Sequence, residues 1–345
     1  MPDPSDPIPP PDPTVRGAAQ ERLDALAKPV GSLGRLEELA AWIAACQGTC
    51  PPRSLDRVRA VVLAGDHGVA AHGVSAYPPQ VTAAMVRTFT DGRAAATVLA
   101  RQHGVELQIH DLAVDDDLGD LPEIVGRYKV RRSSRPLHLG DALTPAEAEL
   151  AYAAGTAIAT AQLQAGSDLI IVGDLGIGNT TPATCLIAAA LGAPAHLVTG
   201  TGTGLDPVAL QRKTVIVDQA LSRMGDRARD PWQRLVGLGS ADLVAGAAIM
   251  ITAARAGVPI LLDGLISVAE AITAEQLAPG VIAWCAAGHR STEPGQRLAC
   301  EKYGLVPILD AGMRLGEGSG ALAALPVLRS AVQLLREMAL LSDLG

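Results

Sequence analysis

Aromatic residues and positive charge are both scarce in this 345-residue chain. Phe, Trp and Tyr make up 2 % of the residues, with a single Phe, so the chain lacks the side chains on which proteins stack nucleic-acid bases. The formal net charge is -8, and no dense run of Lys or Arg interrupts it, which disfavours contact with a phosphate backbone. We therefore expect no nucleic-acid partner, and any pocket for a ring must be largely aliphatic.

Long apolar runs and a disulfide pattern are also missing. No uncharged apolar stretch reaches the roughly 18 residues of a membrane span, and the first residues are rich in Pro and Asp, unlike a signal peptide. The five cysteines are an odd number and are better explained as reduced thiols than as a disulfide framework. We predict a cytoplasmic protein with no membrane partner.

Short apolar runs rich in β-branched residues alternate with longer helical stretches. The runs are VRAVVLAG near residue 58, VELQIHDL near 105, DLIIVGD near 168, AHLVTG near 195, PILLDG near 259 and VIAWCAAG near 281. This alternation predicts an α/β fold, with a Rossmann-like parallel sheet flanked by helices and a smaller helical domain built from N- and C-terminal segments. The expected segments are a disordered Pro-rich tail (1–15), small-domain helices (16–56), the large α/β domain with the active-site loops (57–314) and a C-terminal helix (315–345).

Two of the expected helices carry clear start signals. Thr144, followed by Pro145 and Glu147, is typical of an N-cap, a first-turn Pro and a capping-box acid. Asp206 followed by Pro207 predicts a second start, and a glycine 19 residues after Asp206 is placed to end that helix.

Glycine-rich loops follow several of the predicted strands. In GDLGIGNTTP, the residues Asn179 and Thr180 fall at an expected helix N-terminus, where unpaired N–H groups and the helix dipole favour a phosphate. TGTGTGLD is a second such loop, and Lys213 lies in the helix that follows it. An ordinary strand-to-helix turn explains either loop about as well when it is taken alone.

Several other site classes lack their motifs. GIGNTT loosely imitates a dinucleotide-binding fingerprint, but residues 175–205 contain no Asp or Glu to hold a ribose hydroxyl. Neither a P-loop nor a G-x-S-x-G elbow is present. Asp66, His67 and His72 do not form a complete ligand set with a familiar spacing, so we predict no metal site. His289 is better suited to orient its neighbours or bind an anion.

The loop MRLGEGSGA places an acid between two glycines at the start of an apolar helix. Arg314 supplies a fixed positive charge, and Glu317 could be partly desolvated there and act as a base. A first-turn Glu that complements the helix dipole is the competing explanation, which the local pattern slightly favours.

Seven motifs in one order resemble the nicotinate-nucleotide:dimethylbenzimidazole phosphoribosyltransferase family of cobalamin biosynthesis. They are KPVGSLGRLEELA, AGDHGVAAHGVSAYPPQVTAAMV, GDLGIGNTTPAT, TGTGTGLD, LLDGLISVAEAITA, GHRSTEPG and MRLGEGSGA. The match runs in this order from about Lys28 to Val332. The resemblance implies a homodimer that needs no cofactor and no metal. It also implies transfer of the phosphoribosyl group of nicotinate mononucleotide to 5,6-dimethylbenzimidazole, which gives alpha-ribazole 5'-phosphate and nicotinate.

The resemblance also implies the site residues. Glu317 would be the catalytic base that takes a proton from the attacking benzimidazole. The remaining residues would bind the two substrates, the apolar ones at the benzimidazole ring: Tyr77, Met85, Asp174, Leu175, Gly176, Asn179, Thr180, Gly202, Thr203, Lys213, Asp263, Gly264, Ser291, Arg314, Leu315 and Gly316. Many family members have Glu at the position of Asp174, and Thr201 also departs from the usual pattern. A silent binding protein and a Rossmann-type oxidoreductase stay as alternatives, and the presence of Glu317 favours the enzyme.

Overall fold

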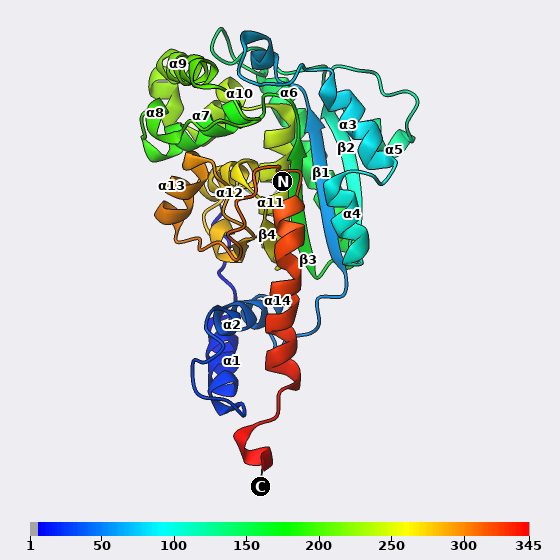
Figure 1. The fold of residues 1–345 in the computed structure, drawn as a ribbon, viewed down its shortest axis with the longest axis vertical. Helices are drawn as coiled ribbons and strands as arrows, with labels where there is room; N and C mark the ends of the chain where they lie inside the picture. Colours follow the sequence, from blue (N-terminus) through cyan, green and yellow to red (C-terminus); the bar gives the residue numbers. More distant parts are fainter. Residues whose placement is uncertain (1–5, 345) are drawn as a thin grey trace.

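Five parallel strands form the sheet at the centre of the computed structural model, which describes residues 6–344 (Figure 1). They are β1 (Val58–Gly65), β2 (Glu106–Ala113), β3 (Leu169–Leu175), β4 (Ile260–Leu262) and β5 (Cys285–Ala287). Their order is β2-β1-β3-β4-β5, and every neighbouring pair is parallel. The predicted α/β class with a Rossmann-like sheet is confirmed.

Helices cover both faces of this sheet. The longer ones are α1 (Pro13–Ala25), α2 (Arg35–Gln47), α3 (Val81–Thr90), α4 (Ala95–Gln102), α6 (Pro145–Gln164), α7 (Thr180–Leu191), α9 (Pro207–Met224), α10 (Pro231–Leu238), α11 (Ala241–Arg255), α12 (Leu265–Leu277), α13 (Pro294–Tyr303) and α14 (Ser319–Glu337). Short helical turns are η1 (Gly68–His72), α5 (Glu123–Gly126), α8 (Ala195–Val198), η2 (Gly225–Arg229), η3 (Val281–Trp284) and η4 (Leu341–Leu344). Every residue of β3 is buried, as a central parallel strand requires.

One predicted strand is wrong. The run AHLVTG near residue 195 forms the short helix α8, which packs among α7, α9 and α13 instead of joining the sheet. Ala195 and Val198 are buried while Leu197 is exposed, and this spacing of three fits a helical turn, not the alternation of a half-buried strand. Six residues are too few for their apolar pattern to separate the two. The TGTGTG loop therefore follows a helix, not a strand.

The predicted helix starts at Thr144 and Asp206 are confirmed. The Thr144 hydroxyl accepts the N–H of Glu147, and the Glu147 carboxylate accepts the N–H of Thr144, which completes the capping box. The Asp206 carboxylate accepts the N–H of Ala209 at the start of α9.

The Pro-rich segment is ordered from residue 6, contrary to the expected disordered tail. The Ile8 side chain is 4 % exposed, and its N–H donates to the Pro279 carbonyl at 2.7 Å. The Trp284 indole donates to the Pro9 carbonyl at 2.9 Å, and α1, capped by Asp12, begins at Pro13, three residues before the predicted helices (16–56). Proline prevents helix and ladder bonding here, but its carbonyls still accept hydrogen bonds. Residues 1–5 of the predicted tail lie outside the described residues.

Helices α1 and α2 lie with the C-terminal part of α14, below the sheet in Figure 1. Arg22 Nε donates to the Leu335 carbonyl at 2.9 Å, and the Ala27 N–H donates to the Ala339 carbonyl at 2.8 Å. The first turns of α14 instead pack against β3 and β4, so this helix connects the terminal segments to the sheet. Whether they form a separate domain stays a prediction. Among residues 6–344, no helix is both long and apolar enough to cross a bilayer.

Candidate active site

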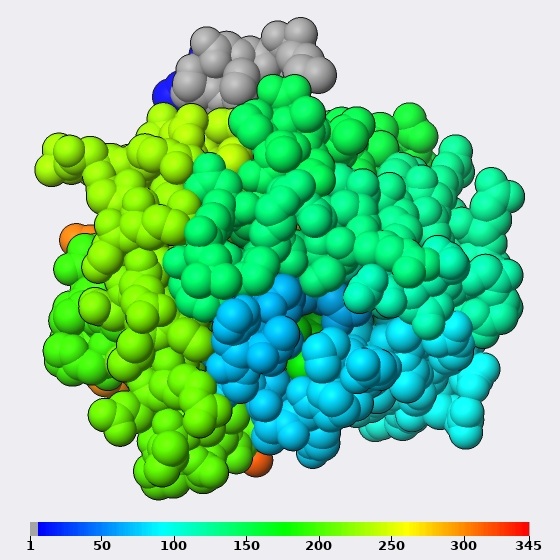
Figure 2. Space-filling model, turned by 90° about the horizontal axis from the view of Figure 1, so that it is seen from above, coloured from blue at the N-terminus to red at the C-terminus, as the bar shows by residue number. Residues whose placement is uncertain are grey.

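A cavity of about 670 Å³ lies at the carboxyl ends of the strands, where a parallel sheet usually binds its ligand. Its volume is in the range of small-molecule sites, about 300–1,000 Å³. Figure 2 shows the end of the molecule that is uppermost in Figure 1. There the light-blue segment around residues 70–80 lies between the blue-green segment near 135–145 and the yellow-green segment of α9 and α10.

The cavity brings together 16 of the 17 site residues that the sequence predicts. They come from loops that are far apart in the chain: Tyr77, Met85, Asp174, Leu175, Gly176, Asn179, Thr180, Gly202, Thr203, Asp263, Gly264, Ser291, Arg314, Leu315, Gly316 and Glu317. Lys213 is the exception, because its side chain is fully buried behind the cavity wall. The proximity of these residues is observed, whereas their contacts with substrates stay a prediction.

The N-terminus of α7 and the buried Lys213 form one polar corner. Lys213 Nζ donates to Thr180 Oγ1 at 2.8 Å and to the Gly200 carbonyl at 3.1 Å. Burial lowers the pKa of the Lys213 amine, and the nearby Glu293 carboxylate opposes that shift. The positive end of the α7 dipole and this buried cation make the corner suitable for an anion, although Asn179 and Thr181 already donate their N–H groups to the Gly176 and Gly178 carbonyls.

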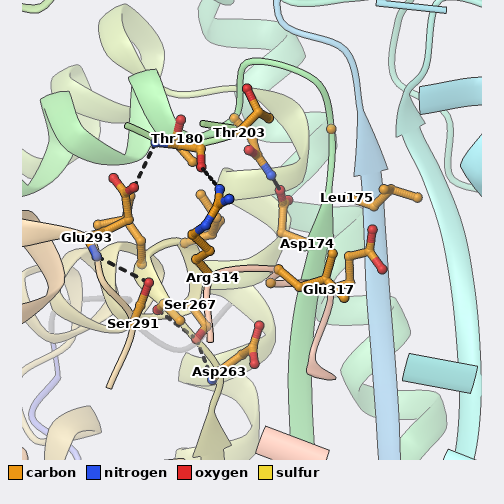
Figure 3. Close-up of a pocket in the computed structure, with 18 of the residues that line it drawn as sticks. Asp174, Leu175, Thr180, Thr203, Asp263, Ser267, Ser291, Glu293, Arg314 and Glu317 are labelled. Carbon is orange, nitrogen blue, oxygen red and sulfur yellow. Dashed lines mark hydrogen bonds between the residues drawn. The ribbon is translucent and has the colours of Figure 1, made fainter. Parts of the chain in front are cut away.

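The TGTGTG loop is held from two sides. The Gly202 N–H donates to Glu293 Oε1 at 2.8 Å, and Arg314 donates to the Gly202 carbonyl at 3.2 Å. Thr203 Oγ1 accepts the Ala76 N–H at 2.8 Å, which ties this loop to the segment after η1. In the view of Figure 3, Arg314 lies between Glu293 on one side and Glu317 on the other.

Much of the remaining cavity wall is apolar. Its side chains are Tyr77, Val81, Met85, Val172, Leu175, Ile177, Leu265, Ile266 and Leu315. Tyr77 and Leu315 are 56 % and 55 % exposed, which places large apolar surfaces at the mouth of the cavity. As expected from the scarcity of aromatic residues, the wall is largely aliphatic, and such a surface suits an uncharged ring.

Glu317 is one of the buried acids of the cavity. Its side chain is 8 % exposed, and its Oε2 has no hydrogen-bond partner. Burial, with a smaller contribution from the charge of Asp263, raises the pKa of Glu317 to about 7. The Glu317 backbone can pack against β3 only because Gly173 has no side chain: a Cβ at Gly173 would lie 2.7 Å from the Glu317 carbonyl carbon. A carboxylate with this pKa can accept a proton at neutral pH.

A second acidic group extends from the cavity wall, where Asp174 lies, into the protein. One ligand atom each from His67, Asp174 and Asp242 falls within 4.8 Å of the others, which makes them a set that could hold a cation. His67 Nε2 lies 3.2 Å from Asp242 Oδ2, and Asn179 donates to Asp174 Oδ1 at 2.7 Å, whereas Asp174 Oδ2 and both Asp242 carboxylate oxygens have no hydrogen-bond partner among residues 6–344. Burial and the neighbouring Asp242 charge raise the pKa of Asp174, so a protonated Asp174 can bond to Asp242.

Comparison with known proteins places the chain in one family. A phosphoribosyltransferase family model matches residues 8–345. The chain belongs to this phosphoribosyltransferase family. One similar relative is the nicotinate-nucleotide-dimethylbenzimidazole phosphoribosyltransferase of Mycolicibacterium paratuberculosis, 51 % identical over 338 residues that cover 98 % of this chain and 96 % of the relative. The enzyme of the same name from Mycobacterium marinum is 50 % identical over 339 residues, 98 % and 94 % of the two chains.

The fold of this family member agrees with solved structures. CobT from Thermus thermophilus superposes with a TM-score of 0.92 at 42 % identity, over 96 % of this chain and 98 % of that one. A structure described as nicotinate-nucleotide-dimethylbenzimidazole phosphoribosyltransferase from the same organism gives 0.90 at 42 % identity, with the same coverage.

Sequence reasoning missed part of the cavity wall of this phosphoribosyltransferase. The additional lining residues are Val81, Thr82, Val172, Ile177, Leu265, Ile266, Ser267, His289 and Glu293. Most of them lie within or directly beside the quoted motifs, so the signal was available. Thr82 was not predicted as a cavity residue because its contact is long-range. Its hydroxyl accepts the Ile177 N–H at 3.0 Å, and these two residues lie in motifs 95 positions apart.

Proposed function

We propose that this chain transfers the phosphoribosyl group of nicotinate mononucleotide to 5,6-dimethylbenzimidazole, giving alpha-ribazole 5'-phosphate and nicotinate for cobalamin biosynthesis. The observation that carries the proposal is Glu317, a buried acid whose pKa is raised to about 7, between an anion-binding corner and an apolar wall. Membership of the phosphoribosyltransferase family and the names of similar relatives support it.

The anion-binding corner serves the nucleotide substrate. The α7 N-terminus and Lys213 attract the 5'-phosphate, and Arg314 adds a fixed positive charge on the loop that carries Glu317. The polar side of the proposed substrate-binding set also includes Gly176, Asn179, Thr180, Gly202, Thr203, Gly264 and Ser291. The Gly202 N–H donates to Glu293 and its carbonyl accepts from Arg314, so both backbone groups of Gly202 already have partners within the protein.

The apolar wall serves the acceptor ring. Tyr77, Met85, Leu175 and Leu315 offer surface to the two ring methyl groups, with Gly316 and Asp174 at the edge. Contacts of this kind separate related rings by only about 1–3 kcal/mol for each methyl group, so we expect the wall to discriminate weakly between related ring systems.

The chemistry requires one base. The bond between the anomeric carbon and the pyridine nitrogen breaks, and its electron pair neutralises the pyridinium, so nicotinate leaves without a general acid. A ring nitrogen of dimethylbenzimidazole supplies the electron pair of the new bond. The N–H on its other ring nitrogen then transfers its proton to the Glu317 carboxylate. Attack from the face opposite the leaving group turns the β linkage into the α linkage, and rate comes mainly from positioning and charge stabilisation.

Product analysis tests this function. Purified protein is incubated with both substrates, with and without a chelator, and products are separated and identified by mass spectrometry and by proton NMR of the anomeric position. We expect nicotinate and the α-configured ribazole phosphate in equal amounts, whether or not chelator is present. Nicotinate formed without a ribazole product would indicate a hydrolase, and no product at all would indicate a silent binding protein.

We also propose that the protein acts as a homodimer in the cytoplasm. The exposed apolar side chains at the cavity mouth, Tyr77 and Leu315, support a second copy nearby, and the family resemblance points the same way. Light scattering coupled to size-exclusion chromatography tests the dimer: a mass near the 35.4 kDa of one chain at micromolar concentration would contradict it.

A further inference from the structure

Asp263 binds the backbone at the start of α14, although it follows β4 in the sequence. Its Oδ2 accepts the Gly318 N–H at 3.0 Å, and its Oδ1 accepts the N–H groups of Gly320 and Ala321 at 2.7 and 3.1 Å. The side chain is 2 % exposed. A carboxylate has about four acceptor positions, and three are used here, so little capacity is left for a sugar hydroxyl.

Helix α14 depends on this contact because it lacks a cap of its own. Its N-cap residue is Gly318, which has no side chain to accept the first N–H groups. Free N–H groups at a buried helix start need a partner, and a negative charge also suits the helix dipole. Asp263 therefore takes the place of an N-cap side chain from 55 residues away.

The backbone of Glu317 needs external support. Its φ is 64°, and its neighbours Gly316 and Gly318 have φ of 82° and 83°, so three consecutive residues lie in the left-handed region. This conformation costs a residue other than glycine about 1–3 kcal/mol and persists only where the surrounding structure holds it. The Gly318 N–H bound by Asp263 belongs to the peptide directly after Glu317.

His289 closes the other side of the same helix start. A Cβ at Gly320 would lie 1.9 Å from the His289 ring, so this turn of α14 packs directly on the imidazole. His289 Nε2 lies 3.6 Å from Asp263 Oδ1. The first turn of α14 is thus held between a carboxylate that binds its N–H groups and a ring that limits its position.

We propose that Asp263 is a positioning residue that holds the Glu317 loop in its reactive conformation, and not a ligand of the ribose. This inference rests on the proposed phosphoribosyl transfer and replaces the substrate-binding role that the family resemblance implied for Asp263. Its negative charge has a second effect, because it adds to burial in raising the pKa of Glu317. Asp263 thus acts on both the place and the basicity of the carboxylate.

The variant Asp263→Asn tests this role. The amide keeps one acceptor oxygen, but its NH₂ group must face a backbone N–H that it cannot accept. We expect kcat to fall about 100-fold, since a displacement near 1 Å costs about that much, while the dissociation constant of nicotinate mononucleotide stays nearly unchanged. A ribose ligand would give the opposite split, with weaker binding and a nearly normal kcat, and that result would overturn the proposal.

Glu293→Gln is the matched control. Glu293 is also a buried carboxylate of the cavity that accepts one backbone N–H, from Gly202, but it is in the loop that follows β5 and its partner is the phosphate-side loop. We expect this change to alter the binding of nicotinate mononucleotide and to leave the titration of Glu317 in place. Circular dichroism spectra of both variants must match that of the parent protein.

Two measurements keep the test decisive. The first is carbon NMR of the Glu317 carboxyl, whose signal is assigned by its loss in Glu317→Gln. The titration midpoint of this carboxyl should be lower in Asp263→Asn than in the parent protein, and this readout does not depend on activity. Gly320→Ala disturbs the same helix start without removing the charge, so it should lower kcat at an unchanged midpoint. An unmoved midpoint in Asp263→Asn, or a normal kcat in Gly320→Ala, would contradict the proposal.

If the parent protein itself transfers nothing, the proposed function fails instead, and the NMR midpoint still tests the link to Asp263.

Discussion

Replacing Glu317 with Gln is expected to stabilise the protein at high pH while it removes activity. The pKa of this carboxyl is raised from the ordinary 4.5 to about 7 in the folded state, first by burial and then by the Asp263 charge. Between these two values the folded protein binds more protons than the unfolded chain, so stability falls as pH rises. The loss is absent below pH 4.5 and complete above pH 7.

The size of this effect follows from the two values. Their difference corresponds to about 3 kcal/mol of unfolding free energy at pH 8, since each tenfold change in acidity is worth about 1.4 kcal/mol. At about 2.1 cal/mol/K of unfolding entropy per residue, a chain of 345 residues would gain about 4 °C in Tm. Gln keeps the shape of Glu but cannot ionise, so the variant avoids the loss.

Urea unfolding at pH 5 and pH 8 measures the effect. The difference in unfolding free energy between Glu317→Gln and the parent protein should grow by about 2.5 kcal/mol from the lower to the higher pH, because a small part of the loss is already present at pH 5. Comparing the two pH values cancels the cost of exchanging an acid for an amide. Glu149→Gln, a change at an exposed position of α6, is the control and should show no such growth. An equal difference at both pH values would refute the raised pKa of Glu317.

Three further changes test the rest of the site. Lys213→Met removes the buried charge behind the α7 N-terminus, and calorimetry should show nicotinate mononucleotide binding weaker by about 10- to 100-fold; unaltered affinity would count against the phosphate corner. Met85→Ala should raise the KM for dimethylbenzimidazole about 10-fold without changing that for the nucleotide, and a change in both would place Met85 elsewhere. Gly173→Ala should cost about 1–3 kcal/mol of stability and lower kcat, because its Cβ meets the Glu317 backbone. Gly17→Ala in α1, where nothing lies within 4 Å, is its control and should stabilise the fold slightly.

Local signals made part of the fold predictable. The starts of α6 and α9 are set by contacts within four residues, such as Thr144 with Glu147, so their side-chain types alone identify them. The strand prediction for AHLVTG near residue 195 was wrong because tertiary packing, and not the short apolar pattern of this run, decides between helix and strand. The order of residues 6–12 also depends on distant partners, as the Ile8 to Pro279 hydrogen bond shows.

The candidate site was predictable in outline because parallel strands end at one edge of a sheet. Thr180 follows β3 and Asp263 follows β4, so both line the cavity although 83 positions separate them. Their chemistry was less predictable. The burial of Lys213 and the capping of α14 by Asp263 result from contacts between distant loops, which no spacing in the sequence reveals.

The most direct test of the account is the rate of nicotinate release from nicotinate mononucleotide as a function of pH, with and without dimethylbenzimidazole. The account predicts release that depends on the acceptor, rises with pH through a midpoint near 7, and falls by about 100- to 10,000-fold in Glu317→Gln. Release that is independent of the acceptor, or that shows the same pH profile and rate in Glu317→Gln, would contradict it.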